Sequence, residues 1–168
     1  MNFAASMQIF WRLQSGSATQ AIDSLTQSGF RVIEFEGSRI IDRVDLFAEF
    51  DRAIGYDHMI TRWDAFEDLY RDADSLDLTR TSFEQFPAGY AFVFLDAEKM
   101  QLAAQEEQLL FLAFEDVARY WSIPVDADPI DSHPSLPVVV IFSGDSSSAK
   151  WPWWSQLPEW SVDGGGRS

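Results

Sequence analysis

The chain has 168 residues and a formal net charge of −15, from 27 acidic and 12 basic residues. This charge disfavours direct binding to nucleic acid or to an anionic membrane surface, and it favours a basic protein partner. Because the sequence contains no cysteine, disulfides, thiolate metal sites and cysteine nucleophiles are excluded.

The predicted elements are strands connected by one or two helices. Ser17 and Gln20 predict a capping box at the start of the first helix, and Gly29 follows its end. Asp42 is the expected N-cap of the second helix. Hydrophobic patterning predicts strands at 7–13, 30–35, 90–95 and 137–142, and helices at 18–25, 43–54, 63–73 and 106–121. This order indicates an α/β fold in which a small, mostly parallel sheet of three to four strands packs against α-helices.

Composition divides the chain into three parts. We expect residues 1–29 to form a strand and a helix that pack on a domain spanning residues 30–143. Residues 144–168 form a tail rich in tryptophan and proline. Its tryptophans either fold back on the domain or anchor a partner; they are Trp151, Trp153, Trp154 and Trp160.

Residues 63–73 predict an amphipathic helix with one acidic face. The apolar face carries side chains spaced by three and four residues, namely Trp63, Phe66, Leu69, Tyr70 and Ala73. The other face carries Asp64, Asp68 and Asp72 at positions i, i+4 and i+8. Like charges at this spacing repel each other by about 0.2–0.5 kcal/mol per pair, and Arg71 offsets only part of this. Such a row either binds a cationic partner or is an ordinary solvated face.

Two segments of the chain carry a family resemblance. They are the strand and turn Val32-Ile33-Glu34-Phe35-Glu36-Gly37-Ser38-Arg39-Ile40 and the start of the acidic helix, Trp63-Asp64-Ala65-Phe66-Glu67-Asp68-Leu69. Both are similar to segments of the barstar family of intracellular ribonuclease inhibitors, and the resemblance covers about residues 31–143. It implies a small parallel sheet with helices packed on it. It also implies a protein that plugs the active site of a basic ribonuclease with its acidic helix.

The resemblance also implies which residues bind the partner. Asp68 matches the family's dominant carboxylate, which occupies the phosphate pocket of the enzyme. Asp64 matches the second carboxylate of the motif, and Asp116 matches a third acidic contact on the last helix. With their charged neighbours, the expected partner-binding residues are Asp64, Asp68, Asp72, Glu67, Arg62, His58 and Asp116.

The segment before the acidic helix departs from the family pattern. The family usually has two aromatic residues and then Gly-x-Asn there, whereas this chain has His58-Met59-Ile60-Thr61-Arg62. The departure indicates either a target other than barnase or a chain that has lost inhibition.

The sequence offers little for catalysis or metal binding. His58 lies near Asp57, and His133 lies near Asp128 and Asp131, so either histidine could bind a metal or act as a base. Two isolated loop histidines do not supply converging ligands, so we expect no metal and no cofactor. Neither a phosphate-binding glycine loop nor a nucleophile beside a base occurs, so we expect no enzyme.

The leading hypothesis is therefore a cytoplasmic immunity protein of a toxin–antitoxin pair that inhibits a basic ribonuclease and is monomeric when free. The alternative is a non-inhibitory binding module of the same fold that docks through its Trp-rich tail. A third possibility is immunity against a DNase, because a carboxylate that mimics phosphate does not distinguish RNA from DNA. The expected cytoplasmic location follows from the absence of a signal peptide and of an apolar run of roughly 20 residues.

Overall fold

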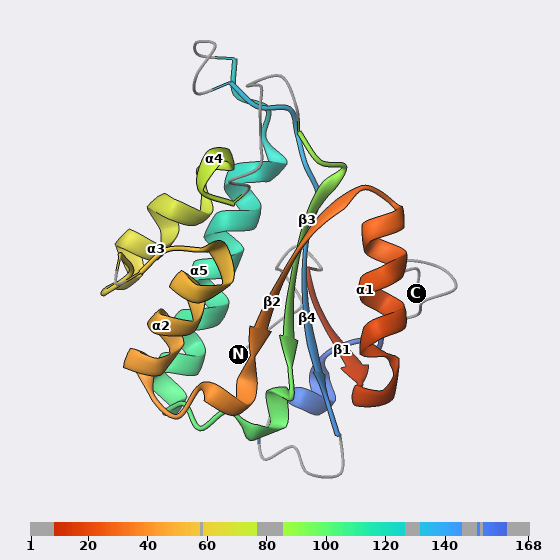
Figure 1. Ribbon diagram of the computed structural model, residues 1–168, viewed down its shortest axis with the longest axis vertical. Coiled ribbons are helices and arrows are strands. Elements are labelled where there is room, and N and C mark those ends of the chain that lie inside the picture. Colours follow the sequence, from red (N-terminus) through yellow and green to blue (C-terminus); the bar gives the residue numbers. More distant parts are fainter. Residues whose placement is uncertain are drawn as a thin grey trace.

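The computed structural model describes residues 9–57, 59–76, 86–126, 132–145, 151 and 153–160. Four parallel strands form one sheet in the order β1-β4-β3-β2 (Figure 1). The strands are β1 (Phe10–Gln14), β2 (Phe30–Glu36), β3 (Gly89–Leu95) and β4 (Val138–Gly144). The α-helices are α1 (Ala18–Gln27), α2 (Arg43–Ile54), α3 (Trp63–Tyr70), α4 (Ala73–Leu76) and α5 (Ala104–Ser122). The predicted small α/β fold is confirmed.

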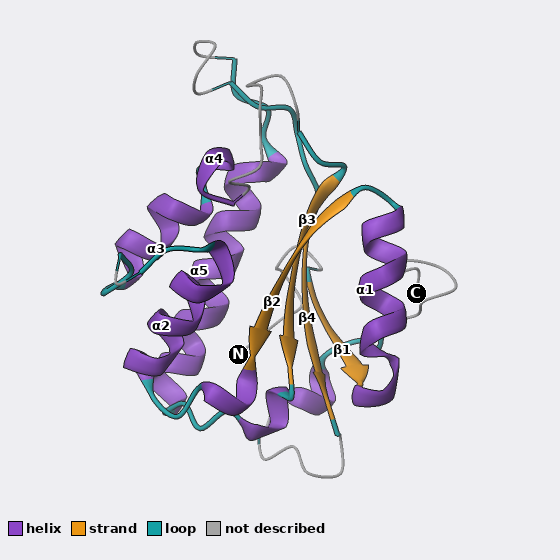
Figure 2. Cartoon of the chain, in the orientation of Figure 1, coloured by secondary structure: helices purple, strands orange, loops and turns teal. Residues whose placement is uncertain are grey.

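Helices cover both faces of the sheet (Figure 2). Helix α1 packs on one face, and α2, α3, α4 and α5 lie on the other. The two sets of side chains alternate along each central strand, as the period of two residues in a strand requires. In β3, Phe92 and Phe94 belong to the larger core under α2–α5, whereas Ala91 and Val93 belong to the smaller core under α1. Both faces of the central strands are therefore buried, which explains their nearly continuous apolar sequence.

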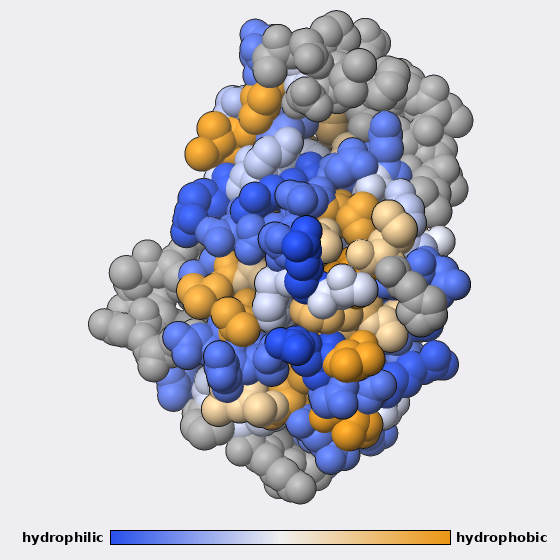
Figure 3. All heavy atoms as spheres, turned by 90° about the vertical axis from the view of Figure 1, so that its left-hand side faces the viewer, coloured by the Kyte–Doolittle hydropathy of each residue, from blue (hydrophilic) through white to orange (hydrophobic). Residues whose placement is uncertain are grey.

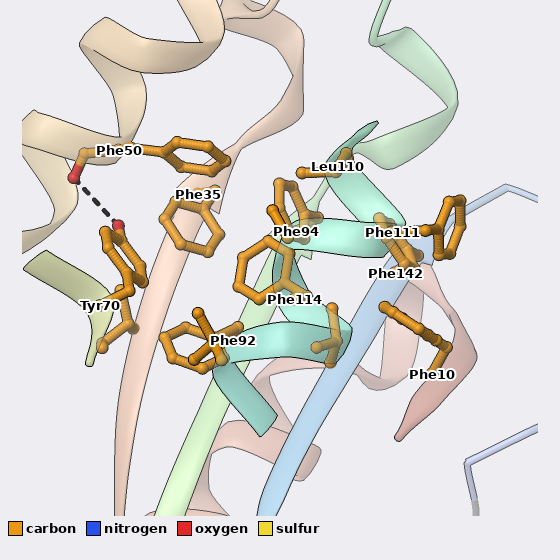
Figure 4. Packing of buried hydrophobic residues seen from close by; sticks show 14 of the residues in the cluster. Phe10, Phe35, Phe50, Tyr70, Phe92, Phe94, Leu110, Phe111, Phe114 and Phe142 are labelled. Atoms are coloured by element: carbon orange, nitrogen blue, oxygen red, sulfur yellow. Dashed lines mark hydrogen bonds between the residues drawn. The ribbon is translucent and has the colours of Figure 1, made fainter. Parts of the chain in front are cut away.

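Aromatic side chains fill the larger core (Figure 4). Phe114 of α5 lies near the centre, with its ring centroid 5.0 Å from that of Phe92 and 5.2 Å from that of Phe66. Phe35 of β2 and Phe50 of α2 continue the cluster at 5.2 Å from each other. Aromatic pairs at these separations add stability beyond simple area burial. This core fixes α2, α3 and α5 relative to the sheet.

The predicted N-cap of α2 is confirmed, whereas the predicted capping box of α1 is not. The Asp42 side chain accepts hydrogen bonds from the backbone N–H groups of Val44 at 2.8 Å and Asp45 at 3.1 Å, as expected of an N-cap. Gly55 ends α2 in the left-handed conformation with φ of 80°. The predicted capping box at Ser17 is wrong, since Ser17 ends a 3₁₀ turn and its side chain makes no capping hydrogen bond.

The Trp-rich C-terminal segment packs against the same chain. The indole ring of Trp153 lies 4.8 Å from the ring of Phe111 and 5.1 Å from that of Phe142. Trp151, Trp153 and Trp154 are all buried. Their side chains are therefore used in this core rather than left free to anchor a partner.

The same segment also extends the sheet at its β1 edge. The backbone N–H of Arg12 donates to the Pro158 carbonyl at 2.9 Å, and the N–H of Trp160 donates to the Arg12 carbonyl at 2.8 Å. On the α1 face, the ring of Trp160 packs edge-on against that of Trp11 at 5.4 Å. Residues 158–160 thus pair with the outer edge of β1 at Arg12. In the part of the chain that the structure describes, no helix is long and apolar enough to cross a membrane.

Candidate functional site

Helix α3 separates its buried face from its charged face. Phe66 and Tyr70 are fully buried, while Asp64 and Asp68 are exposed on the opposite side. The spacing of three and four residues that the sequence shows is what puts them on separate faces. The two carboxylates are held by a helix that is anchored in the core through Phe66 and Tyr70.

Hydrogen bonds fix both ends of α3. At the start, Trp63 donates from Nε1 to Oε2 of Glu106 at 3.3 Å. At the end, the Tyr70 hydroxyl donates to the Phe50 carbonyl at 3.1 Å, and Trp121 donates from Nε1 to the Tyr70 carbonyl at 3.0 Å. Burial raises the pKa of Tyr70 well above its ordinary value, so its hydroxyl stays protonated and remains a donor. These contacts also show that α3 and α5 lie side by side and run in the same direction.

A buried carboxylate positions the segment that precedes α3. Asp51 of α2 is 3% exposed, and both of its oxygens accept from the backbone N–H of Ile60 at 3.0 Å. The Tyr56 N–H donates to the Asp51 carbonyl at 2.9 Å. Met59 beside this anchor is exposed. His58, one of the expected site residues, lies outside the described residues.

The structure brings Asp116 of α5 beside the charged face of α3. Burial raises the pKa of Glu67 above its ordinary value, Arg71 opposes this shift, and Asp116, Asp68 and Asp64 each raise the pKa further by repulsion. The two helices therefore bring four carboxylates onto one surface, which we call the α3–α5 surface and define by Asp64, Glu67, Asp68 and Asp116. Figure 3 shows the helical side of the molecule, where hydrophilic side chains predominate and hydrophobic ones form small separate patches.

Arginines of the same chain pair with three of these four carboxylates. The shortest distances are 2.9 Å from Arg62 to Asp64, 3.1 Å from Arg71 to Glu67 and 2.6 Å from Arg119 to Asp116. The Arg71 guanidinium also lies over the Tyr120 ring, 6.0 Å from its centroid. Among the described residues, no cation lies within ion-pairing distance of Asp68. Asp68 is thus the carboxylate of this surface that is open to an external cation.

The prediction of one continuous helix that aligns Asp72 with Asp64 and Asp68 is wrong. Helix α3 ends at Tyr70, and Asp72 precedes the short helix α4. Its side chain accepts from the backbone N–H groups of Asp74 and Ser75, each at 3.2 Å, and from the Ser75 hydroxyl at 2.6 Å. Asp72 is therefore a structural cap, because its carboxylate satisfies the free N–H groups at the start of α4.

Of the two histidines considered for metal binding, the structure describes only His133. His133 is buried between the rings of Tyr120 and Trp121, and its Nδ1 lies 2.9 Å from the Pro134 carbonyl. Asp128 and Asp131, its neighbours in the sequence, lie outside the described residues. Within the described ranges, no group of three or more histidine, aspartate or glutamate side chains could hold a metal ion.

Comparison with known families identifies the fold. A sequence model of the family described as barstar (barnase inhibitor) matches residues 30–134, which is more than half of the chain. The chain belongs to the barstar family. The match contains β2, β3 and the whole α3–α5 surface, and it confirms the resemblance noted in the sequence. Comparison with curated proteins and with solved structures found no match.

The barstar match ends on both sides inside the observed sheet. Strand β1 and helix α1 precede it, and β4 and the Trp-rich segment follow it. The family is described as a group of enzyme inhibitors rather than enzymes.

Proposed function

We propose that this protein inhibits a basic ribonuclease, and that it serves as the cytoplasmic immunity protein of a toxin–antitoxin pair. Asp68 enters the cationic active site of the enzyme and takes the place of an RNA phosphate. Ribonuclease active sites gather cationic side chains to stabilise the charge that develops on phosphate in the transition state. A carboxylate held at the same point forms charge-assisted hydrogen bonds with those groups and excludes the substrate.

One observation carries this proposal. Within the barstar match, Asp68 is the exposed carboxylate of α3 that has no cation beside it among the described residues. The α3 backbone is already fixed by the contacts of Trp63 and Tyr70, so little ordering cost remains when the partner binds. This matters because a buried ion pair is favourable only when its hydrogen bonds offset the desolvation of both charges.

The proposal is tested by inhibition of purified basic ribonucleases. The panel includes barnase and extends beyond it, since the segment before α3 departs from the family pattern. We expect the wild-type chain to block RNA cleavage by at least one enzyme, and Asp68→Asn to weaken this inhibition at least about 100-fold, because it leaves the enzyme's buried cation unpaired.

Asp23→Asn is the matched control, since Asp23 is exposed on α1 at the opposite face of the sheet. It should inhibit like wild type. Equal inhibition by wild type and Asp68→Asn would contradict the assignment of the site. Rescue of growth in cells that express the inhibited enzyme, again lost with Asp68→Asn, tests the immunity role.

A further inference from the structure

The α3–α5 surface carries nearly balanced charge. Its four carboxylates face three guanidinium groups, which leaves one formal negative charge on a surface of a chain whose total is −15. The arrangement of carboxylates and guanidinium groups on this surface therefore indicates which charges its partner presents.

Arg71 and Arg119 have structural reasons to be where they are. Arg71 is about one-third exposed, pairs with Glu67 and lies over the Tyr120 ring, so it helps to pack α3 against α5. Arg119 is in the last turn of α5, where the helix dipole favours a cation. Their positions follow from the stability of the helices.

Arg62 has no such explanation. It occupies the N-cap position of α3 in an extended conformation, and its side chain makes no capping hydrogen bond. A cation is unfavourable at a helix N-terminus. The Arg62 side chain is 74% exposed and that of Asp64 is 64% exposed, and a pair this open contributes little to stability. The folded chain thus gains almost nothing from an arginine at this position.

The position of Arg62 places it beside the proposed contact of Asp68. Asp64, which pairs with Arg62, lies one helical turn before Asp68 on the same exposed face of α3. A protein that presents a cation to Asp68 can therefore also place a group against the Arg62 guanidinium. A second cation there would be repelled, whereas a carboxylate would be bound.

We propose that Arg62 is a specificity-determining residue that binds a carboxylate of the partner, next to the cation that the partner presents to Asp68. This inference rests on the proposed function. It defines the target as a basic ribonuclease whose cationic centre is bordered by at least one acidic side chain.

The test compares two substitutions that change the net charge equally. Arg62→Glu and Arg39→Glu each make the chain more acidic by two charges, and Arg39 is exposed in the 3₁₀ turn Gly37–Arg39, outside α3 and α5. If net charge alone decided affinity, both variants would bind the inhibited ribonuclease more tightly. We expect Arg62→Glu to bind at least about tenfold more weakly and Arg39→Glu to bind equally or more tightly. Tighter or unchanged binding by Arg62→Glu would overturn the inference.

A double-mutant cycle with Asp64 distinguishes an Arg62 that binds a carboxylate of the partner from an Arg62 that only neutralises Asp64. If Arg62 only neutralises Asp64, Arg62→Gln tightens binding and the effect disappears in an Asp64→Asn background, which would also overturn the inference. If Arg62 binds a carboxylate, Arg62→Gln weakens binding in both backgrounds, as we expect. Thermal unfolding of each variant confirms that the fold is kept, since the exposed pair contributes little stability.

The outcomes distinguish this inference from the proposed function. If wild type inhibits no basic ribonuclease, the proposed function fails and the role of Arg62 fails with it. If wild type inhibits through Asp68 but Arg62→Glu binds no more weakly, only the role of Arg62 fails.

Discussion

At the scale of single residues, Glu67 stands apart from the other carboxylates of the α3–α5 surface. Its side chain is 27% exposed, and burial together with repulsion from Asp116, Asp68 and Asp64 raises its pKa despite the pair with Arg71. The folded chain therefore holds this proton to a higher pH than the unfolded chain does. The stability that comes from this difference is present below the unfolded pKa and is lost as the pH rises through the folded pKa.

Replacing Glu67 with glutamine should therefore stabilise the protein at neutral pH. We expect Glu67→Gln to raise the midpoint of thermal unfolding by about 1–2 °C at pH 7, because it removes a charge that its surroundings disfavour. The gain should vanish at pH 3, where Glu67 is protonated in both states. Calorimetry at the two pH values measures this. A lower midpoint at pH 7 would mean that the pair with Arg71 outweighs burial and repulsion.

Single-residue patterns in the sequence located the exposed carboxylates of α3 but not their partners. Asp64 and Asp68 lie on the exposed face, as helical periodicity indicates. The closeness of Asp116 to Glu67 depends on how α5 packs beside α3, and no spacing along the chain reveals it. The pair of Arg62 with Asp64 depends on an extended backbone before the helix, where the 3.6-residue rule does not apply.

At the scale of elements, the break between α3 and α4 was the largest departure from expectation. The apolar spacing continues through Ala73, so it predicts one helix over residues 63–73. The chain instead leaves the helix after Tyr70, and Asp72 caps a new helix with its own side chain. Aspartate competes well for free backbone N–H groups and so favours a new helix start, which hydrophobic periodicity cannot detect.

Because Asp72 caps α4, its substitution should affect stability, whereas substitution of Asp68 should affect inhibition. We expect Asp72→Ala to lower the free energy of unfolding by about 0.5–2 kcal/mol, since it leaves the N–H groups at the start of α4 without an acceptor. Inhibition measured where the variant is fully folded should be unchanged. Chemical denaturation and the ribonuclease assay measure the two properties. Lost inhibition with unchanged stability would return Asp72 to the binding surface.

At the scale of the whole molecule, the parallel sheet and its two helical layers could be predicted, but the strand at the outer edge could not be placed. The apolar strands at 90–95 and 137–142 identify the centre of the sheet by composition alone. The first strand could have joined either edge or none. It pairs with β4, and its residues precede the barstar match. The tail likewise left two possibilities open, and burial of its tryptophans selects packing within the chain.

The segment at residues 158–160 also protects the sheet from other chains. An uncovered edge strand presents free N–H and C=O groups to any extended chain, and here Pro158 and Trp160 occupy those of Arg12 in β1. We therefore expect a chain that ends at Leu157 to form dimers or larger species as its concentration rises, while a chain that ends at Trp160 stays monomeric. Light scattering over a concentration series measures this, and the second chain controls for loss of residues 161–168. Because Trp151, Trp153 and Trp154 remain in both chains, the larger core stays covered, so self-association would come from the exposed edge together with the face of Trp11 that Trp160 covers. A monomeric chain ending at Leu157 at every concentration would show that the edge needs no cover.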